Sequence, residues 1–447
     1  MIIAIVFMAV VLLLITTLIG YVQFEANSQR KSIGKVKAVN IAEAGIEKAL
    51  WKLNNEQNYS GESNTVYADG VYNIAITTLS GNSKLIRADA YVPSSSNPIS
   101  KSSVQVTATT GTTNISFNYG VQVGLGGLDM SNSAQIIGNV YSNGDIVGTN
   151  SARIQGTAIV AGVGIISGMD VDGNATAYQI LSGSAVGGST TSSGLSNTSV
   201  GGNLVADSIS NCTVGGNATY DTRIGCNIGG VTTTPNPNPY QQQPVQELPI
   251  TEEQIDIWEE DAAAGGVIGT QSYSSGTRNL GPKKINGDLF LSNDAEMVVT
   301  GTLWVTGQIR LSNTSVLRLS SSYGSQGGVV LAGIDESSTA GYIELSNSAQ
   351  ALGSGSSGSY IMLLSQKEGT GSQAIRSSNT GSAAIFYAGE GWIEIGNTAE
   401  LKEITAQKLT INNNATVTYE SGLANSNFSS GPAGGWEILD QTWQTLP

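Results

Sequence analysis

The stretch Leu289-Phe-Leu-Ser-Asn-Asp-Ala-Glu-Met297 decides the fold, because the chain repeats its pattern. Twenty residues later, Ile309-Arg-Leu-Ser-Asn-Thr-Ser-Val-Leu317 has the same apolar positions and the same Ser-Asn pair. Apolar residues alternate with other residues through both copies, as in strands that bury one face. A repeat of this length is typical of one turn in a coil of strands. The pattern therefore predicts a mainly β protein built as a β-solenoid.

Further copies of the pattern occur on both sides of this pair, at spacings of 16 and 18 residues. Every copy has asparagine at one position, and asparagine adopts a left-handed backbone more readily than other non-glycine residues. We expect these residues to turn one strand into the next and to form a side-chain ladder, as in right-handed β-helices. A β-sandwich is the competing fold, and it explains the alternation but not the fixed asparagine. The seven asparagines are Asn132, Asn150, Asn293, Asn313, Asn347, Asn397 and Asn413.

A shorter repeat of 14 residues surrounds the two cysteines. Leu195-Ser-Asn-Thr-Ser-Val-Gly-Gly aligns with Ile209-Ser-Asn-Cys-Thr-Val-Gly-Gly, which makes Cys212 and Cys226 equivalent positions of neighbouring turns. Neighbouring turns lie roughly 4.8 Å apart, within the Cα separation that a disulfide needs. We expect a Cys212–Cys226 disulfide if the body is exported. The alternative is two free thiols packed as small apolar residues.

The coil is expected in two blocks, residues 119–231 and 267–447, separated by residues 232–266. Four prolines between residues 232 and 244 predict a semi-extended linker. A short helix follows, with Thr251 as its N-cap and Gly265-Gly266 at its end. We expect Ile255 and Trp258 to face inward and the acidic residues of this helix to form a solvated face.

The first 55 residues predict one long helix. Residues 1–22 are almost wholly apolar. A helix of this length can span the hydrocarbon core of a membrane. A signal peptide would have a shorter apolar stretch and a small-residue cleavage site. From Val36 to Leu53 apolar residues recur at three- and four-residue steps, so the helix becomes amphipathic.

The apolar helix that runs into Asn40-Ile-Ala-Glu-Ala-Gly-Ile-Glu-Lys-Ala-Leu50 resembles the N-terminal module of type IV pilin-like proteins, especially minor, assembly-associated pilins. Alternating segments in residues 56–118 are consistent with the small antiparallel β-domain that the resemblance implies. No basic leader precedes the apolar run, and Ile5 stands where pilins usually carry glutamate. We therefore expect the chain to begin at or near a processed end. The basic residues after the span favour a cytoplasmic body by the positive-inside rule, whereas a missing basic leader would favour an outward one, which we prefer.

Composition excludes several functions. The formal net charge is −14, which disfavours nucleic acid as a partner because such binding depends on lysine and arginine. The chain contains no histidine, so His-dependent nucleophilic sites and His-ligated metal centres are excluded. Asp170-Val-Asp-Gly-Asn174 resembles the start of a calcium loop, but its glycine falls at the wrong position. The repeats show no carboxylate cluster recurring on adjacent turns. We expect no catalytic residue, no metal site and no cofactor.

The sequence thus predicts a membrane-anchored, surface-exposed bacterial protein with a structural or adhesive role, a minor pilin-like subunit with a β-helix body. Its expected location is the cell envelope, with a single-pass inner-membrane anchor, an extracytoplasmic body and incorporation in a pilus. Expected partners are the membrane, other pilin subunits, and a surface carbohydrate or host-cell ligand. The alternatives are a β-helix polysaccharide lyase or hydrolase and a bactofilin-like polymerising scaffold.

Overall fold

The computed structural model describes residues 2–55, 59–80, 83–110, 112–378, 384–431, 436–439 and 441–446. The chain divides into two compact units. Unit 1 comprises Met1–Thr110 and Trp436–Pro447, and unit 2 comprises Gly111–Gly435. In sequence, unit 2 is therefore an insertion between two parts of unit 1. About half of the residues lie in strands.

Unit 1 is built on the helix α1 (Ile2–Asn55) and an antiparallel sheet. The sheet has the order β1 (Gly61–Tyr67), β2 (Gly70–Ser80), β3 (Ser83–Val92) and β4 (Ser100–Thr110). The two C-terminal strands, β41 (Trp436–Ile438) and β42 (Gln444–Leu446), pair with β4. The second solenoid block, assigned to residues 267–447, thus extends too far, because its last residues complete this sheet.

The two halves of α1 differ in burial. The first half is an apolar helix long enough to cross a membrane, and large apolar side chains along it, such as Phe7, Leu13 and Leu18, are exposed. In the second half, residues spaced at three- and four-residue steps pack against β2, β3 and β4, as an amphipathic helix does. Gly45 permits close contact, since a Cβ there would lie 3.3 Å from both Ala88 and Tyr72 side chains. The buried helix residues are Ala38, Ile41, Ala42, Ile46, Ala49 and Leu53.

Unit 2 is a β-solenoid of about 16 turns, which confirms the predicted fold class. We call each turn a rung. After β5 (Thr112–Ile115), the chain enters the coil at β6 (Val121–Met130). The first block then contains β7 (Gln135–Ile137), β8 (Val140–Ser142), β9 (Ile146–Gly148), β10 (Arg153–Gln155), β11 (Ala158–Val160), β12 (Ile165–Ser167), β13 (Asp170–Val171), β14 (Ala175–Leu181), β15 (Ala185–Val186), β16 (Thr190–Ser196), β17 (Ser199–Val200), β18 (Leu204–Ser210), β19 (Thr213–Val214), β20 (Ala218–Thr219), β21 (Thr222–Ile224), β22 (Asn227–Ile228) and β23 (Thr232–Thr233).

The second block follows the helix α2 (Glu252–Ala264). It contains β24 (Val267–Tyr273), β25 (Thr277–Leu280), β26 (Lys283–Leu291), β27 (Glu296–Val299), β28 (Leu303–Val305), β29 (Ile309–Leu311), β30 (Val316–Leu319), β31 (Gly328–Ser337), β32 (Ile343–Leu345), β33 (Gln350–Leu352), β34 (Ile361–Lys367), β35 (Gly369–Ser378), β36 (Ala384–Gly396), β37 (Glu400–Leu401), β38 (Glu403–Ile411) and β39 (Thr416–Thr418). The short helices η1 (Ser321–Tyr323) and η2 (Ser421–Asn425) and the strand β40 (Ser426–Ser429) complete the unit.

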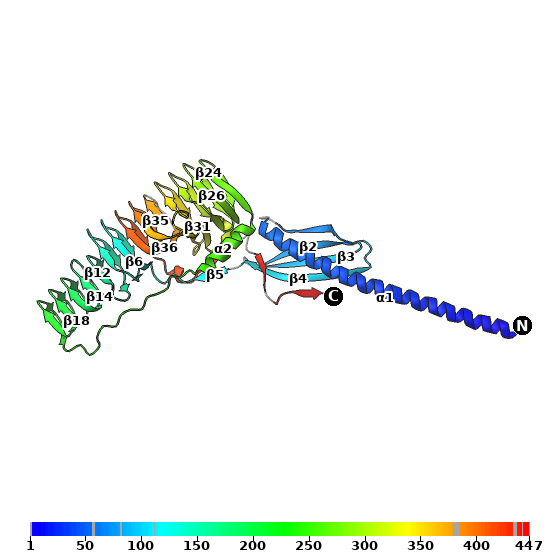
Figure 1. Ribbon diagram of the computed structural model, residues 1–447, viewed down its shortest axis with the longest axis horizontal. Coiled ribbons are helices and arrows are strands. Elements are labelled where there is room, and N and C mark those ends of the chain that lie inside the picture. Colours follow the sequence, from blue (N-terminus) through cyan, green and yellow to red (C-terminus); the bar gives the residue numbers. More distant parts are fainter. Residues whose placement is uncertain are drawn as a thin grey trace. The chain divides into compact units, whose positions relative to one another are not determined.

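The two blocks form one coil, but in the reverse of their sequence order. The last long strand of the second block, β38, pairs in parallel with β6, the first strand of the first block. In Figure 1 this junction is the point where orange β36 and its neighbours meet cyan β6. The coil therefore runs from β24 to β38, passes to β6 without chain continuity, and ends at β23.

One column of inward side chains runs through the whole coil and crosses this junction. We call it the Leu/Ile column. Parallel register connects its twelve members in an unbroken series, and each is at most 2% exposed. Burial of these side chains contributes roughly 1.5–3 kcal/mol each. The members are Leu289, Ile309, Ile343, Ile375, Ile393, Leu409, Leu128, Ile146, Ile166, Ile180, Leu195 and Ile209.

A strap, residues 234–250, connects the end of the first block to α2. It runs along the coil, where Gln122 and Asn143 donate side-chain hydrogen bonds of 2.8 and 2.7 Å to the carbonyl oxygens of Glu247 and Gln246. Such a return is required because β23 and β24 lie at opposite ends of the stack (Figure 1). Seventeen extended residues reach at most roughly 60 Å. About 16 rungs span roughly 75 Å. The helix supplies most of the remaining length.

α2 lies lengthwise across the rungs. Near its start, Tyr387 of β36 donates a 2.9 Å hydrogen bond to the carbonyl oxygen of Ile250. At its end, Lys283 of β26 donates to the carbonyl oxygen of Gly265. A helix of 13 residues is roughly 20 Å long, which equals four rung steps. Thr251 caps it as expected, and Ile255 and Trp258 are buried.

A second core lies outside the coil, beneath α2. Strands β31, β34 and β36 are apolar on both faces, because their outward residues meet the helix. This explains why their sequences are continuous apolar runs and lack the alternation of the other rungs. Its members include Val329, Leu331, Met362, Leu364, Ile385 and Tyr387 of the coil, with Ile250, Ile255 and Trp258 of the helix region.

Candidate functional site

The asparagine corner forms two ladders of side-chain hydrogen bonds. One ladder joins Asn397, Asn413, Asn132 and Asn150 with donor–acceptor distances of 2.9–3.0 Å. The other joins Asn293, Asn313 and Asn347 at 2.9 and 3.0 Å. All seven residues have positive φ, between 51° and 61°. The first ladder crosses the junction, since Asn132 donates to Asn413.

A disulfide bond joins Cys212 and Cys226 at the end of the coil, with Cα atoms 4.4 Å apart. The two residues occupy neighbouring rungs, since Thr213 and Val214 pair in parallel with Asn227 and Ile228. The bond therefore attaches the last rung, which has a neighbour on one side, to the rung before it.

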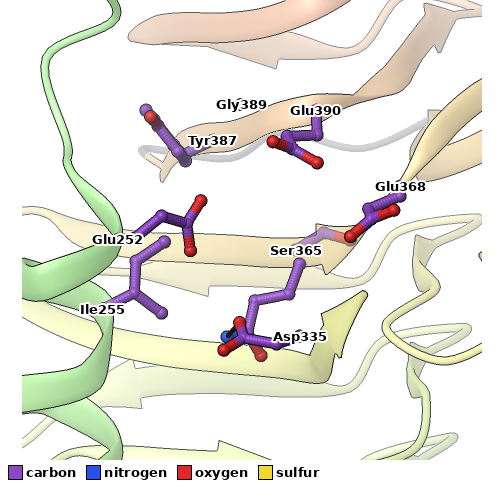
Figure 2. Close-up of a pocket in the computed structure, with 9 residues that line it drawn as sticks. Glu252, Ile255, Asp335, Ser365, Glu368, Tyr387, Gly389 and Glu390 are labelled. Atoms are coloured by element: carbon purple, nitrogen blue, oxygen red, sulfur yellow. Dashed lines mark hydrogen bonds between the residues drawn. The ribbon is translucent and has the colours of Figure 1, made fainter. Parts of the chain in front are cut away.

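An acidic pocket of about 700 Å³ opens between α2 and the edges of β31, β34 and β36. Figure 2 shows four carboxylates around this hollow: Glu252 from α2, and Asp335, Glu368 and Glu390 from three successive rungs. Register explains the clustering. Ser337 pairs with Lys367, and Gly369 pairs with Gly391, so the three acidic residues lie at neighbouring positions of stacked rungs.

The wall of this pocket connects to a half-buried carboxylate of α2. Gln366 donates from Nε2 to Glu259 at 2.8 Å and to Asp335 at 3.3 Å. Burial raises the pKa of Glu259 to about 7. Burial also raises the pKa of Glu252, and the carboxylates of Asp335 and Glu390 add to this effect by repulsion. A carboxyl with a raised pKa therefore lies next to the pocket, and it retains its proton to higher pH than an ordinary glutamate.

Two sequence expectations need correction here. No recurring carboxylate cluster was found in the repeats, yet the structure forms one. The acidic residues of α2 were expected to form a solvated face, but Glu259 is half-buried and Asp261 accepts a hydrogen bond from Ser430. Sequence reasoning missed the cluster because Asp335, Glu368 and Glu390 lie in rungs of unequal length. The available signal was an acidic residue just after each apolar run.

The calcium-like stretch at residues 170–174 has a structural contact. Asp172 forms an ion pair of 2.7 Å with Arg153 of the preceding rung. Among the residues that the structure describes, no group of three acidic or cysteine side chains could hold a metal ion.

Comparison of the chain with protein-family models, with curated proteins and with solved structures finds no match. The fold alone therefore gives the class: a β-solenoid protein with a long apolar N-terminal helix.

Proposed function

We propose that this protein is a membrane-anchored structural or adhesive component of a bacterial cell envelope, with a minor pilin-like module as its base. The observation that supports this most is the architecture of unit 1. The apolar half of α1 is exposed, and its amphipathic half packs on a four-stranded antiparallel meander. This is the arrangement that the resemblance to type IV pilin-like proteins implies.

The exposed half of α1 would be the single-pass anchor. Its most apolar stretch is not covered by the rest of the described chain. A helix that is apolar on all sides is stable in lipid, where its backbone bonds are satisfied internally. The same surface could pack against equivalent helices of other pilin subunits.

The coil would then be the displayed element on the outer side of the membrane. A disulfide such as Cys212–Cys226 persists in oxidising compartments and supports an extracytoplasmic body. Outward positions of the last rungs are rich in hydroxyl groups, for example Thr176, Thr191 and Thr219 in one column, which Val205 interrupts between the last two. Such a row suits weak multipoint contacts with carbohydrate or another cell surface.

Fractionation and immunogold labelling test the proposal. In cells that express the full chain, we expect the protein in the membrane fraction and label on the surface or on filaments of intact cells. Leu13→Arg places a charge in the span and should release the protein, since a central arginine opposes insertion by about 2.5–3.5 kcal/mol. Ser28→Arg, beyond the apolar run, is the matched control and should leave localisation unchanged. Label only inside permeabilised cells would favour a cytoplasmic scaffold.

The acidic pocket supports a second candidate function, a carbohydrate-active enzyme of the β-helix type. Hydrolysis of a glycosidic bond uses one protonated carboxyl as acid and one ionised carboxylate. Glu259 and Asp335 share Gln366 and differ in burial, which suits these two roles. Assay of the full chain on a polysaccharide panel would test it. Turnover that is lost in Asp335→Asn and kept in Glu296→Gln, a control in the second rung and outside the pocket, would establish this function.

A further inference from the structure

The two end rungs of the coil differ from all others in the residues that close the Leu/Ile column. At the last rung, the register places Arg223 beside Ile209, at the position where every rung between the two ends has leucine or isoleucine. At the first rung, it places Gln271 beside Leu289. The column of twelve buried aliphatic residues therefore has a polar residue at both ends.

A neighbouring column ends in the same way. Met297, Leu317 and Ala351 are fully buried and stack in register. In the first rung, Arg278 occupies the position beside Met297. Two arginines thus stand at core positions, one at each end of the coil.

The arginine side chains contact groups of their own end rungs. Arg223 donates from Nε to the carbonyl oxygen of Cys226 at 3.1 Å, three residues further along the last rung. The guanidinium carbon of Arg278 lies 5.6 Å from the centre of the Tyr273 ring, and the group donates to the carbonyl oxygen of Thr277 at 2.9 Å. In the described part of the chain, neither arginine has a carboxylate within ion-pair distance.

Apart from these residues, the strands of the two end rungs lie in matching register positions, so one end rung could pair with the other. Register runs without a break from Thr233 to Val267 in one column and from Arg223 to Gln271 in the next. The first rung of one copy could therefore continue the strands of the last rung of another. The internal junction between β38 and β6 shows that rungs from separate parts of the chain stack in this way.

We propose that Arg223, Gln271 and Arg278 close the ends of the coil against a second copy of this chain. In a head-to-tail stack Arg223 would be enclosed between Ile209 and Gln271, without a counter-ion. Enclosing a charge without a partner is strongly unfavourable, and the two guanidinium groups would also repel each other. Unpaired strand edges at the ends would otherwise recruit further copies. The coil thus ends as a discrete body, unlike a polymerising scaffold.

The test places apolar residues in the two end rungs of the coil. It uses the full chain in detergent. Arg223→Leu, Gln271→Leu and Arg278→Met are combined, and particle mass is measured against protein concentration. The wild type is expected to remain a single copy, whereas the triple variant at least doubles in mass and forms end-to-end particles in electron micrographs. The control combines Arg310→Leu, Gln350→Leu and Arg376→Met, which add equal apolar area on the outer face of mid-coil rungs. It should remain a single copy.

Cross-linking identifies the contact. Thr233→Cys and Val267→Cys lie at matching positions of the two ends, so a disulfide between copies forms only in a head-to-tail stack. We expect it in the triple variant and not in the wild type. A triple variant that keeps its circular dichroism and its Cys212–Cys226 bond but stays single would overturn the proposal. Head-to-tail cross-linking of the wild type would overturn it as well.

Discussion

The hydrogen bond between Asn132 and Asn413 offers a direct measure of what holds the two blocks together. It is the step of the asparagine ladder that crosses the junction, with a donor–acceptor distance of 2.9 Å. A double-mutant cycle of Asn132→Ala and Asn413→Ala isolates the energy of this bond, because effects of each substitution that do not depend on the other cancel.

The expected magnitudes follow from the geometry. Each asparagine makes two ladder bonds and has φ of 51–53°. Loss of two exposed hydrogen bonds costs about 1 kcal/mol at the low end of the net range. Alanine in the left-handed region costs about 1 kcal/mol more. Each single variant should therefore lose about 2 kcal/mol of unfolding free energy, and the coupling between them should be about 0.5–1 kcal/mol.

Urea unfolding of the full chain in detergent, followed by tryptophan fluorescence, gives these free energies from the shift in midpoint. The control cycle pairs Asn132→Ala with Asn313→Ala, which belongs to the other ladder and makes the same number of bonds. Its coupling should be within about 0.3 kcal/mol of zero. Equal coupling in the two cycles would refute the role of the ladder at the junction. Single variants that lose under about 0.5 kcal/mol would refute the backbone argument as well.

Three further predictions concern buried groups. Burial raises the pKa of Glu403 well above its ordinary range, so the folded chain retains a proton that the unfolded chain releases above about pH 4.5. Between that pH and the raised pKa of the folded state, this group should lower stability by about 1.4 kcal/mol per pH unit. Because burial also raises the pKa of Glu259, Glu403→Gln should reduce the total slope in urea unfolding at pH 5 and 8 without abolishing it. An unchanged slope would contradict the assignment. Replacing Cys212 and Cys226 with serine opens a loop of 14 residues. This should lower the unfolding free energy by about 3 kcal/mol and speed amide hydrogen exchange mainly in residues 222–233. An equal increase in exchange along the whole coil would argue against a local role of the disulfide. Trp258→Ala should cost about 3–5 kcal/mol, seen as a lower melting temperature, whereas exposed Ile257→Ala should cost little.

Local pattern was sufficient for the elements of this fold. Alternation and the fixed asparagine predicted the coil, because each rung obeys the same rule of one inward and one outward face. The 14-residue repeat predicted that Cys212 and Cys226 lie on neighbouring rungs, where the disulfide joins them. The cap and the inward residues of α2 were also readable, since they depend on residues within one turn of the helix.

The acidic pocket was not readable in this way. Asp335, Glu368 and Glu390 are separated by 33 and 22 residues, and their rungs have different lengths. Their proximity depends on the pairings of β31 with β34 and of β34 and β35 with β36, which no local pattern specifies. The raised pKa of Glu259 depends further on the packing of α2 across those rungs, because this packing partly buries the Glu259 side chain.

The sequence by itself determined that the chain forms a long apolar helix and a coil of strands, because those signals repeat within a few residues. Only the tertiary structure decided that the second block precedes the first in the coil, and that the last strands of the chain return to unit 1. The physical reason is that a rung offers the same hydrogen-bonding edge to any rung of similar shape. Order along the stack is therefore set by the strap, the junction and the polar residues that close each end.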